Sequence, residues 1–410
     1  MRYKNIIYYS ILILTTLLMM WLLPVLVSKL TYKPDRYPFV YYSTILNELA
    51  VIDYTNKQLP MSDKKGNTYT TSEMDSLLPM LNYRQLMSDG RLPDSIKGQE
   101  INARILRAKS FTFRYDPAEI KTPNNGLYIL FESMPKRVGL TMPDDVFRMK
   151  DKIEFINTES NKVDEAKSQI FQEELSKNGY TFPSSWLIGN PNPRKPYDEG
   201  YFSLDNKGQL FHMKMVNGRP YIKNTGIGDK IDIAYFSMLE VPDKRFYGFL
   251  FSEQGDIYII QNEVGNYQTL KLEIPPIDIE ADQIIIMGNL FEWTVSITKP
   301  EGKQCYGLDN NSLKQLDEHF IQRELGKWDK VSEWVFPVYL TVESKDSNYL
   351  TPTFLYTGVY ALVLNILLAI IGGICFSNIT KRRIFNAIYI LITGVAGFLA
   401  LLILPKFRKN

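Results

Sequence analysis

The chain has 410 residues, with 47 Lys and Arg against 45 Asp and Glu, so its formal net charge is +2. This balance argues against a nucleic-acid-binding protein, which usually carries a clear basic surplus. Two Cys and two His are too few for a zinc framework. Cys305 belongs to a polar region and Cys375 to an apolar one, so we expect no disulfide between them.

Three long runs without ionisable side chains predict membrane-spanning helices. They cover residues 6–28, 347–380 (most apolar at 354–376) and 384–405. About 20 helical residues cross a hydrocarbon core of about 30 Å, and a charge at its centre is costly. The first run ends at Ser28 without a small-x-small cleavage site, so we interpret it as an uncleaved anchor.

These runs divide the chain into three predicted regions. Residues 1–30 form an N-terminal transmembrane anchor, 31–346 a β-rich domain, and 350–405 a two-helix transmembrane hairpin. None of the apolar runs carries an ionisable residue, so we do not expect the chain to conduct a solute by itself.

A hairpin pattern repeats in the middle of the chain. Residues 202–211 and 249–258 each contain an apolar strand, a polar turn closed by Gly208 or Gly255, and an apolar-aromatic pair. Partial copies surround Gly288 and Gly66. Gly supplies the positive φ of such turns, and the 47-residue spacing from Gly208 to Gly255 is typical of a four-stranded propeller blade.

We therefore predict a mainly β fold: a propeller-like extracytoplasmic domain with a few helices, plus three transmembrane α-helices. Both ends of this domain continue into spanning helices, and a propeller brings its first and last strands together. The spacing of the repeats is uneven, however, and a β-sandwich or an irregular meander would produce similar hairpins.

Three helices are expected within the β-rich domain. One begins at Ser72, with Asp75 three residues later, and is limited by Pro79. A second covers residues 164–178, and a third begins at a Ser312–Gln315 capping box and continues as an amphipathic helix to residue 325. Three prolines predict a loop at residues 190–196.

The basic residues near the apolar runs give a weak orientation signal. Lys381, Arg382 and Arg383 lie in a very short loop, where the positive-inside rule is strongest, and this favours a cytoplasmic N-terminus. The opposite signal comes from residues 29–36 and 406–409. We expect an inner-membrane, multi-pass protein whose large domain is periplasmic or extracellular.

Candidate metal sites are better explained by packing. In a strand after Gly208, Met213 and Met215 would share a core face opposite His212 and Lys214, so the four do not converge on copper. Asp278, Glu280 and Asp282 would alternate along a half-buried strand with a charged outer face, without the loop spacing of a calcium site.

Candidate catalytic residues are equally weak. The sequence has no nucleophile motif and no phosphate-binding loop. The pairs Asp144–Asp145 and Asp198–Glu199 could serve a glycosidase, but adjacent acids in loops are usually solvated. His319 falls on the third predicted helix. We therefore expect no catalytic, cofactor-binding or metal-binding residue, and no cofactor.

Small residues recur at helical spacing in the C-terminal apolar runs. Ala369 and Gly373 are four residues apart, and Gly394 and Gly397 are three apart. Such residues let helices approach closely, so we predict packing between the last two helices, with docking on a partner's helix as the alternative.

The layout resembles an uncharacterised family of bacterial membrane-anchored proteins of about 400 residues. The matching features are the anchor, the segment 69–94 with Tyr83-Arg84-Gln85-Leu86 and Asp89-Gly90-Arg91-Leu92-Pro93-Asp94, the hairpins and the C-terminal helical hairpin. The resemblance implies an association with ABC-type export systems and carries over no catalytic residue.

Three functions remain open. The first is a membrane-tethered, non-enzymatic binding or scaffold protein, an accessory component of an ABC-type transporter complex. The second is an extracytoplasmic propeller enzyme acting on carbohydrate or another hydrolysable substrate, and the third is a ligand sensor. The missing catalytic motifs favour the first. Its expected partners are the lipid bilayer and an integral membrane protein, with no nucleic acid.

Overall fold

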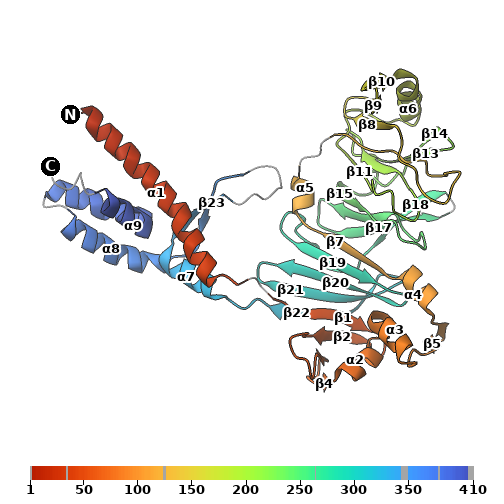
Figure 1. Cartoon of the computed structure of the whole chain (residues 1–410), viewed down its shortest axis with the longest axis horizontal. Coiled ribbons are helices and arrows are strands. Elements are labelled where there is room, and N and C mark those ends of the chain that lie inside the picture. The colour runs from red at the N-terminus through yellow and green to blue at the C-terminus, as the bar shows by residue number, and fades with distance from the viewer. Residues whose placement is uncertain are drawn as a thin grey trace. The chain divides into compact units, whose positions relative to one another are not determined.

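The computed structural model describes residues 2–33, 36–122, 126–263, 265–342, 350–376 and 379–404. It divides into two compact units. The β unit is Tyr37–Gln322, and the helical unit combines Met1–Arg36 with Arg323–Asn410 (Figure 1). Among the described residues the fold is mainly β, with several antiparallel sheets and nine helices. The basic residues at 406–409 that entered the orientation argument lie outside this description.

The β unit contains five main antiparallel sheets and one small hairpin. The first sheet has the order β1 (Phe39–Ser43), β2 (Glu48–Ile52), β3 (Met61–Ser62), β4 (Thr68–Tyr69). The second is β10 (Lys162–Asp164), β9 (Ile153–Asn157), β8 (Asp145–Met149). The third is β11 (Trp186–Gly189), β12 (Tyr201–Leu204), β13 (Leu210–Val216), β14 (Arg219–Asn224).

The fourth sheet is β15 (Ile233–Met238), β16 (Gly248–Ser252), β17 (Ile257–Glu263), β18 (Asn266–Lys271). The fifth has the order β22 (Gln315–Gln322), β21 (Gly302–Asp309), β20 (Glu292–Lys299), β19 (Gln283–Gly288), β7 (Phe111–Tyr115). The small hairpin pairs β5 (Ser95–Ile96) with β6 (Gln99–Glu100). Strand β7 comes early in the chain but pairs with β19, which comes far later.

The glycines predicted at the two hairpin turns are confirmed by their positive φ angles. Gly208 has φ 75° and Gly255 has φ 87°, and both lie between paired strands. Gly66 also closes a turn, with φ 83°. Gly288 was expected in a turn and instead ends β19, where it pairs with Trp293. A side chain there would overlap the ring of Phe111, so close packing rather than a turn requires this glycine.

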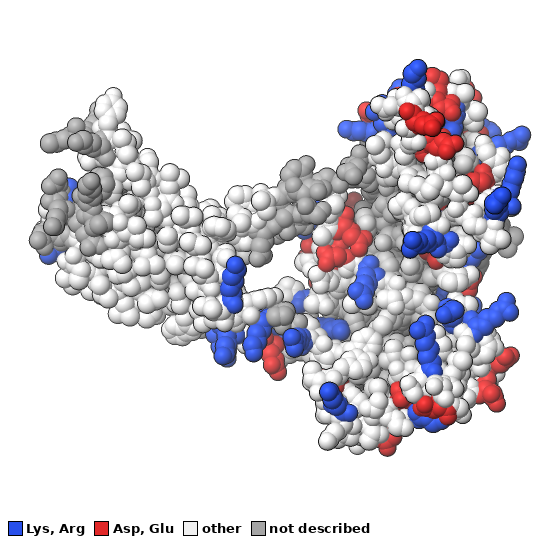
Figure 2. Space-filling view, viewed as in Figure 1, with Lys and Arg blue, Asp and Glu red and all other residues white. Residues whose placement is uncertain are grey.

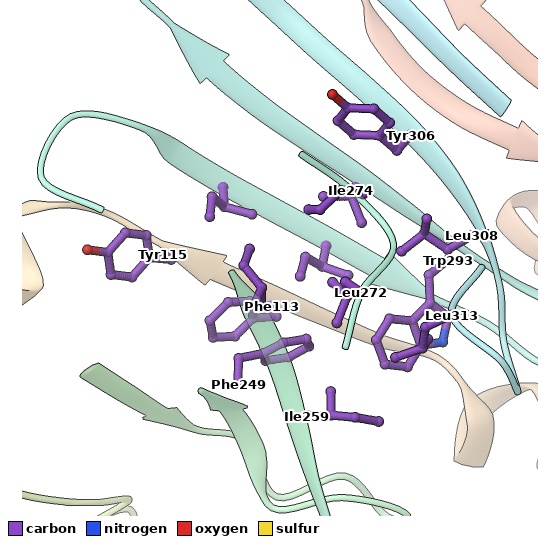
Figure 3. Packing of buried hydrophobic residues seen from close by; sticks show 14 of the residues in the cluster. Phe113, Tyr115, Phe249, Ile259, Leu272, Ile274, Trp293, Tyr306, Leu308 and Leu313 are labelled. Carbon is purple, nitrogen blue, oxygen red and sulfur yellow. The ribbon is translucent and has the colours of Figure 1, made fainter. Parts of the chain in front are cut away.

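Apolar clusters join neighbouring sheets. One cluster lies between the fourth and fifth sheets, where Phe113 of β7 and Phe249 of β16 stack with ring centroids 4.1 Å apart (Figure 3). Other clusters join the third sheet to the fourth, and the second sheet to the third. The predicted propeller is not confirmed, because the sheets are neither curled nor closed into a ring.

The helices of the β unit are α2 (Thr71–Leu77), α3 (Pro79–Ser88), α4 (Ala103–Lys109), α5 (Ala118–Lys121) and α6 (Glu165–Lys177). The second predicted helix is confirmed as α6, which begins at an Asp164 cap and buries Phe171 and Leu175. The first is confirmed with a shifted start, since the capping box is formed by Thr70 and Glu73. Pro79 follows the end of that helix and is also the first residue of the next helix, α3.

The third predicted helix is wrong. Residues 315–322 form the edge strand β22, paired with β21. Leu316 and Phe320 have the four-residue spacing of a helix face, yet both are exposed on the strand. Ser312 does not cap a helix, because its backbone N–H and its hydroxyl both donate to Asp309 Oδ1 in a turn, at 2.8 Å each.

The helical unit contains α1 (Arg2–Thr31), α7 (Lys327–Val335), β23 (Val338–Thr341), β24 (Thr353–Tyr356), α8 (Ala361–Cys375) and α9 (Thr380–Ile403). Within the described part of the chain, two helices and not three are long and apolar enough to cross a membrane: the 27-residue segment Asn5–Thr31 and the 24-residue segment Thr380–Ile403. Helix α8 has only 15 residues, because the start of the second apolar run is used by β24, which pairs with β23.

Small residues do mediate packing between α8 and α9, as predicted. Ala369 is 7 % exposed, and a side chain on Gly373 would touch Ala387. Gly394 has a different role: with φ 64° and ψ −143°, it interrupts the helical backbone of α9. Asn365 of α8 lies against this interruption and donates to the Leu391 carbonyl oxygen at 3.1 Å.

Candidate functional site

A groove with a cavity volume of about 660 Å³ opens on the β unit between α3 and α4. Its lining comes from both helices and from the loop before β16: Tyr83, Arg84, Met87, Ala103, Arg104, Arg107, Ala108 and Pro242. We call it the basic groove, because three of these eight residues are arginines and none is acidic.

The two helices pack against a shared apolar cluster. Met80 of α3 and Leu106 of α4 are buried in it with Phe291, and Tyr83 of the groove packs against it. Arg104 and Arg107 of α4 are exposed. Helix α4 is fixed at its start by Asn102, whose side chain accepts a hydrogen bond from the Ile105 N–H at 2.9 Å.

The three guanidinium groups leave the groove with an uncompensated positive charge. Arg104 and Arg107 are one turn apart on α4, and among the described residues neither has a hydrogen-bonding or ion-pair partner. Arg84 donates from Nε to the Tyr83 hydroxyl at 3.3 Å and forms no ion pair within the described chain. Figure 2 shows Lys and Arg side chains gathered over the part of the β unit that holds α3 and α4.

The acid next to the groove is already neutralised. Asp243 follows Pro242, and its carboxylate lies 3.1 Å from Lys109 Nζ and 3.3 Å from Arg245 Nε. Arg245 also donates to the Lys109 carbonyl oxygen at 2.7 Å and to Asn310 Oδ1 at 2.6 Å. Burial lowers the pKa of the Arg245 guanidinium, and the charge of Asp243 opposes this effect. The network ties the end of α4 to the Pro242 loop and leaves the groove arginines unpaired.

This arrangement suits an anion attached to an apolar group. The planar guanidinium group matches carboxylate and phosphate oxygens with two parallel hydrogen bonds. Met87, Ala103, Ala108 and Pro242 provide apolar surface beside these donors. The groove therefore has both components of a binding site for an amphipathic anionic ligand.

A second polar cluster is buried and saturated. Lys195 Nζ lies 2.6 Å from Asp198 Oδ1 and 2.8 Å from Glu240 Oε1, and these three side chains are at most 3 % exposed. The other oxygen of Asp198 accepts from the Ser133 hydroxyl at 2.6 Å, and that of Glu240 from the Asn190 amide at 2.9 Å. Burial raises the pKa of Glu240, and Lys195 opposes this. Asp198 is thus part of a buried ion-pair cluster and not of a solvated loop.

His212 lies beside this cluster on β13, on the face opposite Met213 and Met215, as predicted. Its ring stacks on Phe202, with centroids 4.5 Å apart. Nε2 is 2.6 Å from the Glu199 carbonyl oxygen, which can only accept, so Nε2 carries the proton. Nδ1 then accepts from the Tyr267 hydroxyl at 2.6 Å. Burial lowers the pKa of His212 to about 3, so the imidazole is neutral.

The remaining candidate acids do not converge on one site. Glu199 pairs with Lys214 at 2.6 Å, and Asp145 pairs with Lys167 at 2.6 Å while its neighbour Asp144 accepts hydrogen bonds through its backbone oxygen. Asp278 and Asp282 were expected on a strand and instead close a turn, in which the Asp282 N–H donates to the Asp278 carbonyl oxygen at 2.8 Å. A group of three or more His, Cys, Asp or Glu able to hold a metal ion is absent from the described residues.

His319 was expected on a helix and lies on β22. It lines a shallow cavity of about 670 Å³ with Lys64, Gln304, Tyr306, Glu318 and Phe320. The pKa of His319 is lowered mainly by burial, and the charge of Lys64 lowers it further. The adjacent Asp317 pairs with Lys64 and accepts from the Leu49 N–H at 2.8 Å, so this cavity is bordered by paired charges.

One known sequence family matches the chain over most of the β unit. The sequence model of a family described as a domain of unknown function, DUF4857, matches residues 39–308. The chain belongs to the DUF4857 family. The curated proteins contain no match. Among solved structures, dihydro-heme d1 dehydrogenase NirN in complex with DHE is similar at 12 % identity, over 68 % of this chain and 73 % of that one, with a TM-score of 0.20. A likeness this weak carries no argument.

In this DUF4857 protein the whole basic groove falls inside the matched range, while α1 and α9 fall outside it. From the sequence, Tyr83 and Arg84 were part of the family resemblance but were not assigned to a site. Helix α4 was not predicted, because its seven residues are too few for a periodic signal. The available signal was the spacing of Arg104 and Arg107 between two alanines, which places both arginines on one helix face.

Proposed function

We propose that this DUF4857 protein is a membrane-tethered binding protein that holds an anionic partner segment in the basic groove. The observation that carries the proposal is the set of three unpaired arginines beside an apolar lining. The apolar helices α1 and α9 support the tether, since their length and composition suffice to cross a bilayer.

The partner we propose is an integral membrane protein of an ABC-type export complex, with the chain as its non-enzymatic accessory subunit. The support is the resemblance in layout together with the burial of the carboxylates Asp198 and Glu240, which are held in ion pairs with Lys195 away from solvent. We propose a multi-pass topology with a cytoplasmic N-terminus, and a span by α1 then places the β unit in the periplasm.

The test is co-purification of the full-length chain from mildly solubilised membranes of its native cells. The variant R84E/R104E/R107E reverses the groove charge, and K57E/K65E/K207E reverses three exposed lysines elsewhere as a matched control. We expect wild type and control to recover an ATPase and a permease in fixed ratio, and the groove variant to recover at least tenfold less. Equal recovery by the groove variant, or a wild-type chain that purifies alone, would overturn the proposal.

A further inference from the structure

A second groove lies in the helical unit, beside the C-terminal end of α1. One wall is formed by Pro24, Val25 and Ser28 of α1 and by Tyr32, which follows the helix. The other wall comes from Trp328 of α7 and from β23, with Tyr339, Leu340 and Thr341. The cavity has a volume of about 360 Å³. We call it the interfacial groove.

The surroundings of the groove have the composition of a membrane interface. Trp334 of α7 is 53 % exposed and stacks on Tyr360, the residue before α8, with centroids 5.3 Å apart. Phe354, Leu355 and Tyr356 of β24 are also exposed. Trp and Tyr are enriched at the bilayer surface, so these exposed side chains suit a membrane interface.

Positive charge is concentrated at the same end of the helical unit. Lys29, Lys33, Arg36, Lys327 and Lys330 have no ion-pair partner among the described residues. Arg323 is paired with Asp329 at 3.0 Å, which leaves Glu324 and Glu333 as the unpaired acids of this segment. In Figure 2 the helices of this unit are mostly white, and blue side chains gather at the end where α7 lies.

The groove joins these two surfaces. Pro24 and Val25 belong to the apolar end of the span, and Ser28 is followed directly by the unpaired Lys29. Trp328 packs edge-on against Tyr339, with centroids 5.9 Å apart, and is preceded by the unpaired Lys327. The groove lining therefore combines apolar side chains with hydroxyl groups, and unpaired lysines adjoin two of its residues in the sequence.

We infer that the interfacial groove binds an anionic phospholipid of the surrounding bilayer. Its acyl chains lie along Pro24, Val25 and Leu340, and its phosphate lies near Lys29 and Lys327. Helix α7 and the β23–β24 hairpin then rest on the membrane surface. This inference does not depend on the basic groove, because every residue that it uses belongs to the helical unit.

The test titrates the delipidated full-length chain in mild detergent with brominated phosphatidylglycerol or brominated phosphatidylcholine, which quench tryptophan fluorescence. We expect saturable quenching with a preference for the anionic lipid. The variant K29Q/K327Q/K330Q should lose about fivefold in affinity per lysine, on the order of 100-fold in total, since each cation near an anionic surface contributes about that factor. The control K57Q/K65Q/K207Q should bind like wild type.

A second variant reports on the place of binding. Trp328→Phe should remove most of the saturable quenching while the chain still retains phosphatidylglycerol in native mass spectrometry. Equal affinity for both lipids, or unchanged saturable quenching in Trp328→Phe, would overturn the inference. So would displacement of the bound lipid by a co-purified membrane protein, because the groove would then be a protein interface.

Discussion

At the scale of single residues, the polar groups of the β unit fall into two kinds. Lys195, Asp198, Glu240 and His212 are buried and paired with other protein groups. Arg104 and Arg107 are exposed and unpaired within the described chain, so their chemistry is available to a ligand. Residue type alone does not separate the two kinds, because the difference is made by neighbours that are distant in sequence.

His212 predicts a specific pH dependence of stability. Its pKa is about 3 when folded and about 6.5 when unfolded, so the unfolded chain binds more protons between these values. Stability is therefore complete above about pH 7 and is lost as the pH falls, by about 1.3 kcal/mol between pH 7 and 5.5. Denaturation of the full chain in detergent at both pH values should show this loss in wild type and not in His212→Gln. His319→Gln, at the other histidine, should retain most of it; an identical slope in both variants would refute the assignment.

At the scale of elements, the sequence predicts a conformation correctly where residues close in the chain determine it. The Asp164 cap and the spacing of Phe171 and Leu175 located α6. The same kind of signal failed for β22, since Leu316 and Phe320 mimic a helix face and only pairing with β21 decides the conformation. The second apolar run failed similarly, because residues 353–356 pair with β23 instead of extending α8. The basic groove joins α3, α4 and the Pro242 loop, a convergence that no single segment encodes.

The two turn glycines give a matched pair for a test of element stability. Both have positive φ, so alanine at either position costs roughly 1–2 kcal/mol in backbone strain. A side chain at 208 would meet no neighbour within 4 Å, whereas one at 255 would overlap the Ile277 carbonyl oxygen. We expect Gly208→Ala to cost about 1 kcal/mol and Gly255→Ala about 3 kcal/mol or more in thermal or chemical unfolding. Equal costs would show that the Ile277 segment moves away freely.

At the scale of the whole molecule, the chain combines a β unit that carries the DUF4857 match with a helical unit that lies entirely outside it. The sequence located the apolar runs because length and lack of charge are local properties. It could not resolve which of them span, because α8 is short and α9 is interrupted at Gly394 where Asn365 contacts it. Basic residues flank α1 on both sides, so charge counting leaves the orientation open.

Orientation can be tested with single cysteines in the intact protein. Cys305 is buried, and burial raises its thiol pKa, so it should not react; Cys375→Ser removes the other native thiol. In this background, Lys57→Cys places a thiol on an exposed loop of the β unit, and Tyr3→Cys places one before the apolar segment of α1. A small charged maleimide that enters the periplasm but not the cytoplasm should label position 57 in intact cells and position 3 only after lysis. The reverse pattern would place the β unit in the cytoplasm, where its basic groove would meet a different set of anionic partners.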